Sequence, residues 1–178
     1  MGTPFVIFDR DGTLIEHVPH LVEPSEVRFK PDLISGLTKL RDSGFHFGMV
    51  TNQSVIGRGL ATFERVAEIN TLILDYLATN GIQFDFVLVC PHRPDESCNC
   101  RKPNIGLGLE AIQNFNLLPR ASYIVGDQET DLIFGINLGC RAVQVKGNAK
   151  KSEYADYYSL SLSDAASWIV HEMSTQGR

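Results

Sequence analysis

Short apolar runs alternate with stretches of helical periodicity along the chain. The apolar runs predict strands at 5–8, 45–52, 86–90, 122–127 and 141–145. Apolar positions three and four residues apart, bounded by Pro, Thr or Gly, predict helices from Pro31 to the stop at Gly44, from Thr62 to Gly81, near 106–115, near 128–138 and over 163–174. This alternation predicts an open, Rossmann-like α/β fold in which helices cover both faces of a parallel sheet.

Length and composition fit one globular domain spanning residues 1–178. The chain has 178 residues, of which 43% are hydrophobic and 21% charged, and no repeat or linker interrupts it. A net charge of -5 without a basic patch argues against broad nucleic-acid binding. Asp9 is the first acidic residue, which leaves no apolar stretch long enough for a signal peptide or a membrane span. We therefore expect a cytoplasmic monomer without nucleic-acid or membrane partners.

Polar side chains follow several of the predicted strands at the point where each strand ends. In open α/β sheets, ligands bind beyond the carboxyl ends of the strands. Asp9 and Asp11 follow the first strand, and because alternate residues of an extended segment point the same way, they can face one site. One carboxylate could act as nucleophile or metal ligand and the other as acid and base, with Mg²⁺ relieving their repulsion. An isolated Asp-X-Asp is more often a solvated acidic turn, so the remaining strand ends decide between these interpretations.

Those other strand ends favour a phosphoryl-transfer site. The Thr51 hydroxyl and the Asn52 amide end the second strand and could hold phosphate oxygens. Asp127 ends a later strand and adds a cation ligand, whereas Asp131, one helical turn on, is interpreted only as a charge near a helix N-terminus. Two cations in the segment "CRKP" could neutralise a transferring phosphoryl group: Arg101 and Lys102.

The loop "CPHRPDESCNC" at 90–100 has the spacing of a zinc site. Three thiolates and one imidazole in the order CxH…CxC suit tetrahedral zinc, with the ligands Cys90, His92, Cys98 and Cys100. Four protein ligands fill the coordination sphere, so this zinc would be structural. Reduced surface cysteines or a disulfide are the alternatives, and they leave the histidine without a role. Because Arg101 and Lys102 follow the last ligand directly, zinc would also fix these two cations.

The segments "DRDGT", "TNQS", the lysine of "CRKP" and "GDQETD" resemble the four ordered motifs of the haloacid dehalogenase (HAD) superfamily of phosphatases, from about residue 5 to about residue 146. Within it, the chain resembles the group of D-glycero-D-manno-heptose 1,7-bisphosphate 7-phosphatases and histidinol-phosphate phosphatases, which carry the same zinc loop. The resemblance implies Asp9 as nucleophile forming an aspartyl-phosphate and Asp11 as general acid, then base. It also implies Mg²⁺ bound by Asp9, the Asp11 backbone carbonyl and Asp127.

The substrate is a small phosphorylated metabolite on this interpretation. No inserted domain interrupts the chain, so we expect a capless site whose loops set specificity. The expected substrate-binding residues are His17, His20, Asn52, Gln53, Ser54, Arg58 and Arg101. The segment "NQSVIGRG" and the two arginines favour a heptose bisphosphate, whereas the short gap between His92 and Cys98 also resembles histidinol phosphatases. Val55 and Gly57 depart from the heptose pattern, which usually has Gly and Ala there.

Two further classes stay open on the sequence alone. A phosphosugar-binding protein without catalysis is disfavoured because every acidic motif residue is intact. A zinc-organised interaction module is disfavoured because zinc binding alone does not require Asp9, Asp11, Lys102 and Asp127.

Overall fold

Six parallel strands form the centre of the molecule, which the computed structural model describes over residues 2–146 and 150–176. In chain order they are β1 (Phe5–Phe8), β2 (His46–Asn52), β3 (Phe86–Cys90), β4 (Tyr123–Gly126), β5 (Arg141–Val145) and β6 (Tyr157–Ser159). Their spatial order is β3-β2-β1-β4-β5-β6, and every neighbouring pair is parallel. The predicted Rossmann-like α/β fold is therefore confirmed.

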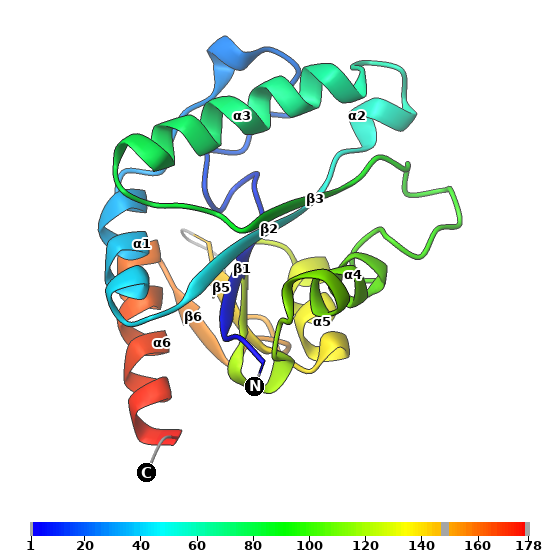
Figure 1. Cartoon of the computed structure of the whole chain (residues 1–178). Coiled ribbons are helices and arrows are strands. Elements are labelled where there is room, and N and C mark those ends of the chain that lie inside the picture. Colours follow the sequence, from blue (N-terminus) through cyan, green and yellow to red (C-terminus); the bar gives the residue numbers. More distant parts are fainter. Residues whose placement is uncertain (1, 147–149, 177–178) are drawn as a thin grey trace.

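Helices cover both faces of this sheet (Figure 1). One face carries α1 (Leu33–Asp42), α3 (Phe63–Thr79) and α6 (Leu162–Gln176), and the other carries α4 (Gly106–Phe115) and α5 (Glu129–Leu138). Shorter turns of helix are η1 (Pro24–Glu26), α2 (Ser54–Gly57) and η2 (Pro119–Ala121). All five predicted helices are present. In residues 2–146 and 150–176, none of the helices is long and apolar enough to cross a membrane.

Strand β1 shows why the sheet needs helices on both sides. Val6 and Phe8 pack into the core beneath α1, α3 and α6, whereas Phe5 and Ile7 pack into the core beneath α4 and α5. All four side chains are buried, because successive residues of a strand point to opposite faces and both faces are covered. The continuous apolar run "FVIF" is therefore typical of a central parallel strand.

Strand β6 is the one strand of the described chain that the apolar pattern did not predict. It has three residues, Tyr157–Ser159, and lies at the edge of the sheet beside β5. A run this short and polar gives no periodicity. Trp168 of α6 stacks on Tyr157 with 4.8 Å between ring centroids, and the Arg141 guanidinium lies 4.9 Å from the Trp168 ring. These ring contacts connect the final helix to the sheet edge.

The order of the strands places a crevice beyond β1 and β4. Chain connections run outward in opposite directions from these two neighbours, and ligands bind at such a switch point, outside the carboxyl ends of the strands. Asp9 follows β1 and Asp127 follows β4 at this edge. Shortly after Asp9, Gly12 turns the chain with φ +86°, and a Cβ atom at Gly12 would lie 2.7 Å from the Asp127 carboxylate. The turn brings the two acidic segments together.

Gly48 of β2 leaves space for the aromatic ring of Phe86, its partner on β3. A Cβ atom at Gly48 would lie 2.1 Å from Cζ of Phe86, its partner across the strands. We expect Gly48→Ala to lower the free energy of unfolding by about 1–3 kcal/mol, measured by urea titration, because the added methyl overpacks the core. In a Phe86→Leu background the same change should cost less, since the two sites couple. An equal cost in both backgrounds would contradict this account of Gly48.

Candidate active site

A buried ammonium group lies at the centre of the crevice. Lys102 is 3% exposed. Its Nζ lies 2.6 Å from Asp9 Oδ1, 2.8 Å from Asp131 Oδ1 and 2.6 Å from the Val50 carbonyl oxygen. These contacts join the ends of β1 and β2 to the start of α5 through a segment just after the cysteine-rich loop.

The charges of this group shift one another's titration. Burial raises the pKa of Asp9 to about 8, and although Lys102 opposes the rise, the carboxylates of Asp131 and Asp11 add to it. Burial would lower the pKa of Lys102, but attraction by Asp131 and Asp9 outweighs burial and raises it above its usual range. Lys102 therefore stays positively charged, and a second positive charge beside Asp9 would favour the ionised form of its carboxyl group.

Three carboxylates in this crevice fit a divalent cation. Asp9, Asp127 and Asp131 are all buried, and each offers an oxygen within 4.8 Å of the others. Burial and repulsion by Asp131 raise the pKa of Asp127. Its Oδ1 is buried and has no hydrogen-bond partner among the described residues, while its Oδ2 accepts a hydrogen bond from the Gln128 side chain. One ammonium leaves these carboxylates undercompensated, and oxygen donors are the ligands that Mg²⁺ prefers.

Asp131 has a larger role than its position near a helix N-terminus predicted. It does cap α5, because Oδ2 accepts a hydrogen bond from the Gln128 backbone amide over 3.0 Å. Its Oδ1 contacts Lys102, and only 2% of the residue is exposed. The interpretation as a helix charge alone was therefore wrong. The four-residue spacing from Asp127, which puts both side chains at the same helix start, was the available signal.

Asp11 faces the same crevice but is held apart from the three carboxylates. Arg10 donates to both of its oxygens, from Nε to Oδ2 over 3.0 Å and from Nη2 to Oδ1 over 3.2 Å. Gln53 Nε2 donates to Oδ2 over 2.8 Å and also to the Thr51 hydroxyl oxygen over 2.8 Å. Sequence reasoning did not identify Arg10, because alternation along an extended segment turns its side chain away from the face that Asp9 and Asp11 share.

Asn52 positions Lys102 through the backbone. Its Oδ1 accepts a hydrogen bond from the Lys102 amide over 3.0 Å, and its Nδ2 donates to the Lys102 carbonyl over 3.2 Å. This paired contact ties the end of β2 to the segment that carries the buried ammonium. Thr51, the neighbouring residue, is 1% exposed, and its hydroxyl oxygen accepts the hydrogen bond from Gln53.

Two adjoining cavities open at this edge of the sheet. The first has a volume of about 490 Å³, and its lining includes Asp9, Asp11, His17, Asn52, Arg101, Lys102, Asp127 and Asp131. The second has a volume of about 320 Å³, and its lining includes Arg10, Asp11, His17, His20, Asn52, Gln53 and Ser54. They share Asp11, His17 and Asn52. Arg58 lines neither cavity in the described part of the chain; it is exposed, with Nε 3.5 Å from Ser54 Oγ.

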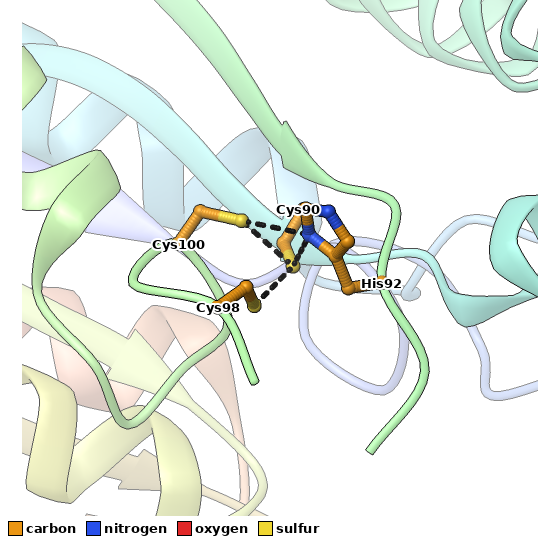
Figure 2. A group of neighbouring side chains, drawn as sticks. All are labelled: Cys90, His92, Cys98 and Cys100. Carbon is orange, nitrogen blue, oxygen red and sulfur yellow. Dashed lines mark hydrogen bonds between the residues drawn. The ribbon is translucent and has the colours of Figure 1, made fainter. Parts of the chain in front are cut away.

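The cysteine-rich loop brings its four predicted ligands together (Figure 2). Cys90 Sγ lies 3.2 Å from Cys100 Sγ and 3.8 Å from Cys98 Sγ, and His92 Nδ1 lies 3.1 Å from Cys100 Sγ. Tetrahedral zinc with bonds of about 2.3 Å separates two sulfur ligands by about 3.8 Å, so small adjustments suffice to hold the ion. Within the described residues, no disulfide joins the three cysteines of this cluster to one another or to Cys140.

The same loop contacts both sides of the crevice. Arg101 Nη1 donates to the His92 carbonyl over 3.0 Å, which fixes this cation beside the cavity. On α2, the Gly57 amide donates to the Pro91 carbonyl over 2.9 Å. A Cβ atom at Gly57 would lie 2.8 Å from that carbonyl oxygen. Glycine at this position thus allows α2 to pack closely on the loop.

Comparison with known proteins places this arrangement in a family. A family model described as HAD-hydrolase-like matches residues 99–170. The chain is 40% identical over 128 residues to the Thermoplasma volcanium protein named "Probable D-glycero-D-manno-heptose-1,7-bisphosphate 7-phosphatase", covering 72% of this chain and 86% of that one. It is 34% identical over 158 residues to the histidine biosynthesis bifunctional protein HisB of Blochmanniella floridana, covering 85% of this chain but 44% of HisB.

A solved structure agrees over nearly the whole length. D,D-heptose 1,7-bisphosphate phosphatase from B. bronchiseptica, crystallised with magnesium and phosphate, superposes with a TM-score of 0.86 at 26% identity. The superposition covers 96% of this chain and 99% of that one. Likeness over most of both chains, together with acidic residues after β1 and β4 and a lysine between them, leads to one conclusion: the chain belongs to the haloacid dehalogenase superfamily of phosphatases.

Proposed function

We propose that this chain hydrolyses the 7-phosphate of D-glycero-D-manno-heptose 1,7-bisphosphate through an aspartyl-phosphate on Asp9, with Mg²⁺ bound beside it. The observation that carries the proposal is the Lys102 ammonium, 2.6 Å from Asp9 inside a group of three buried carboxylates. A nucleophilic carboxylate, a fixed cation and oxygen ligands suited to a divalent cation are the parts that phosphoryl transfer requires.

The residues around Asp9 suit a bound Mg²⁺ ion. We assign its protein ligands to Asp9, Asp127 and the backbone carbonyl of Asp11, with Asp131 alongside. The buried, unpartnered Oδ1 of Asp127 and the raised pKa of Asp9 both support a cation here. When bound, Mg²⁺ neutralises charge on the phosphoryl oxygens and helps align the phosphate with the nucleophile. The magnesium named in the B. bronchiseptica structure supports Mg²⁺ as the identity of the proposed ion.

The side chains divide the reaction between them. An Asp9 oxygen forms a bond to phosphorus while the ester P–O bond breaks, and the Asp11 carboxyl gives its proton to the departing oxygen. The Asp11 carboxylate then takes a proton from water, whose oxygen attacks phosphorus and frees Asp9 and phosphate. Lys102 balances charge throughout. We propose that the Thr51 hydroxyl, which accepts its hydrogen bond from Gln53, donates its own hydrogen to a phosphoryl oxygen.

Arg101 is the arginine best placed for a second phosphate group. It lines the cavity that contains Asp9, whereas Arg58, the other sequence candidate, is exposed outside it. In this proposal residues 1–178 form one capless domain. The part of the substrate that extends away from Asp9 is bound by His17, His20, Asn52, Gln53 and Ser54. The name of the relative at 40% identity supports the heptose substrate.

Histidinol phosphate is the second candidate substrate. The 34% identity to HisB and the short loop between His92 and Cys98 favour it. Its outer end carries an amine instead of a phosphate, so Arg101 would contribute nothing to binding or would repel it.

The first prediction of the proposal concerns the nucleophile. Asp9→Asn should abolish Mg²⁺-dependent phosphate release, because an amide cannot attack phosphorus, while circular dichroism shows an intact fold. Asp11→Asn should lower kcat by about 10²–10⁴, the usual contribution of general acid–base catalysis. Asp85→Asn, at an exposed carboxylate paired with His46, is the control and should keep full activity. Near-normal turnover by the Asp9 variant would exclude the covalent mechanism.

The second prediction concerns zinc. Elemental analysis of purified protein should find one zinc per chain that survives dialysis, because four protein ligands close the site. Cys98→Ser should reduce the zinc content and lower the thermal midpoint, since structural zinc contributes directly to folding. Cys140→Ala, at a buried cysteine outside the cluster, should keep its zinc. Absence of zinc, together with a fold unaffected by chelators, would refute the structural-zinc assignment.

The third prediction concerns substrate choice. The unaltered enzyme should show a higher kcat/KM for heptose 1,7-bisphosphate than for histidinol phosphate. Arg101→Ala should lower the ratio of kcat/KM for heptose 1,7-bisphosphate to kcat/KM for histidinol phosphate roughly tenfold to a hundredfold, because a charge-assisted hydrogen bond contributes about 1.5–3 kcal/mol. Arg58→Ala is the matched control and should leave the ratio unchanged. A higher kcat/KM for histidinol phosphate in the unaltered enzyme would show that the heptose assignment is wrong.

A further inference from the structure

A buried arginine stands behind the Asp11 carboxyl group. Arg10 is 1% exposed, although guanidinium groups are rarely buried without full pairing. Its Nε and Nη2 each donate to one Asp11 oxygen, so the two groups meet as a bidentate pair. Such a pair fixes the plane of a carboxylate as well as its position.

The guanidinium is itself oriented by two amide side chains. Asn70, which is 5% exposed on α3, accepts a hydrogen bond from Nη1 over 3.0 Å. Gln53 accepts from Nη2 over 2.9 Å, while its own Nε2 donates to Asp11 Oδ2. The Asn70 side chain is polar on the buried face of α3, between Ile69 and Ile73, where an apolar residue would otherwise be expected. Its contact with Arg10 accounts for a polar group there.

We propose that Asn70 and Arg10 are positioning residues that orient the Asp11 carboxyl for proton transfer to the leaving oxygen. This inference rests on the acid–base role proposed for Asp11. When Asp11 gives up its proton, the guanidinium stabilises the carboxylate that remains, and its fork holds that carboxylate at the angle needed to take a proton from water in the second step. Asn70 lies on another element of the fold and acts only through Arg10.

Substrates whose leaving groups differ in basicity distinguish positioning of the Asp11 acid from a general structural role of Asn70. Departure of 4-nitrophenolate needs little protonation, whereas phenolate is more basic and depends on the acid. The test measures phosphoenzyme formation by rapid acid quench in a single turnover, with 4-nitrophenyl phosphate and phenyl phosphate as probes. Arg10→Ala risks misfolding because it leaves buried partners unpaired, so Asn70→Leu is the principal variant: it removes one hydrogen bond and keeps the branching and the number of side-chain heavy atoms.

Asn70→Leu should slow phosphoryl transfer from phenyl phosphate about tenfold and transfer from 4-nitrophenyl phosphate less than about threefold. The loss with phenyl phosphate is then a part of the factor of about 10²–10⁴ that a general acid usually contributes to the rate. Asn70→Asp keeps the acceptor oxygen and should recover most of the loss. Ser122→Ala removes buried hydrogen bonds to Phe5 and Leu118 at the opposite end of the sheet. This control should affect stability without changing the ratio of the two rates.

Three results would overturn the inference, and they identify which part fails. Equal slowing of both probes by Asn70→Leu, while Asp11→Asn slows phenyl phosphate selectively, would remove the positioning role and leave the proposed function intact. Failure of Asn70→Asp to recover the rate would show that the acceptor oxygen is not what matters. Equal slowing of both probes by Asp11→Asn would refute its role as the acid, and the positioning role with it.

Discussion

The buried ammonium of Lys102 is the interaction on which the rest of the site depends. Without it, Asp9 and Asp131 would be carboxylates removed from water with no cation, a cost of several kcal/mol for each. Its position depends on the two hydrogen bonds between the Asn52 side chain and the Lys102 backbone, one accepted and one donated by Asn52, and on the strand order that brings β1, β2 and β4 side by side. The remaining negative charge is what makes the crevice suited to a divalent cation.

The fold was predictable because parallel strands buried on both faces give continuous apolar runs, and the helices between them have clear periodicity. β6 was not, since three residues give no pattern. Asp9, Asp127 and the cluster of Cys90, His92, Cys98 and Cys100 could be predicted because their signals are local: strand ends and close spacing. The links from Asn70 to Arg10 and from Asp131 to Lys102 join residues that are 60 and 29 positions apart, and a single sequence does not show which distant side chains meet.

The cysteine-rich loop connects the chemistry to substrate choice. Its three clustered cysteines and His92 gather at the end of β3, its His92 carbonyl accepts a hydrogen bond from Arg101, and its Pro91 carbonyl accepts one from the Gly57 amide of α2. The position of Arg101 in one cavity and the position of α2 beside the other therefore both depend on the shape of this loop. Arg58 and Arg101 were both candidates for a second phosphate group in the sequence, and their placement separates them, because Arg101 lines the cavity that contains Asp9 whereas Arg58 is exposed outside it.

The central claim is that Asp9 forms a covalent bond to phosphorus within this group of charges. Acid quench during turnover with Mg²⁺, followed by digestion and mass spectrometry, tests it most directly. The account predicts one phosphoryl group on the peptide containing Asp9, which hydroxylamine removes as expected of an acyl phosphate. Phosphate release with the phosphoryl group on another residue, or with no labelled peptide under conditions that preserve acyl phosphates, would contradict it.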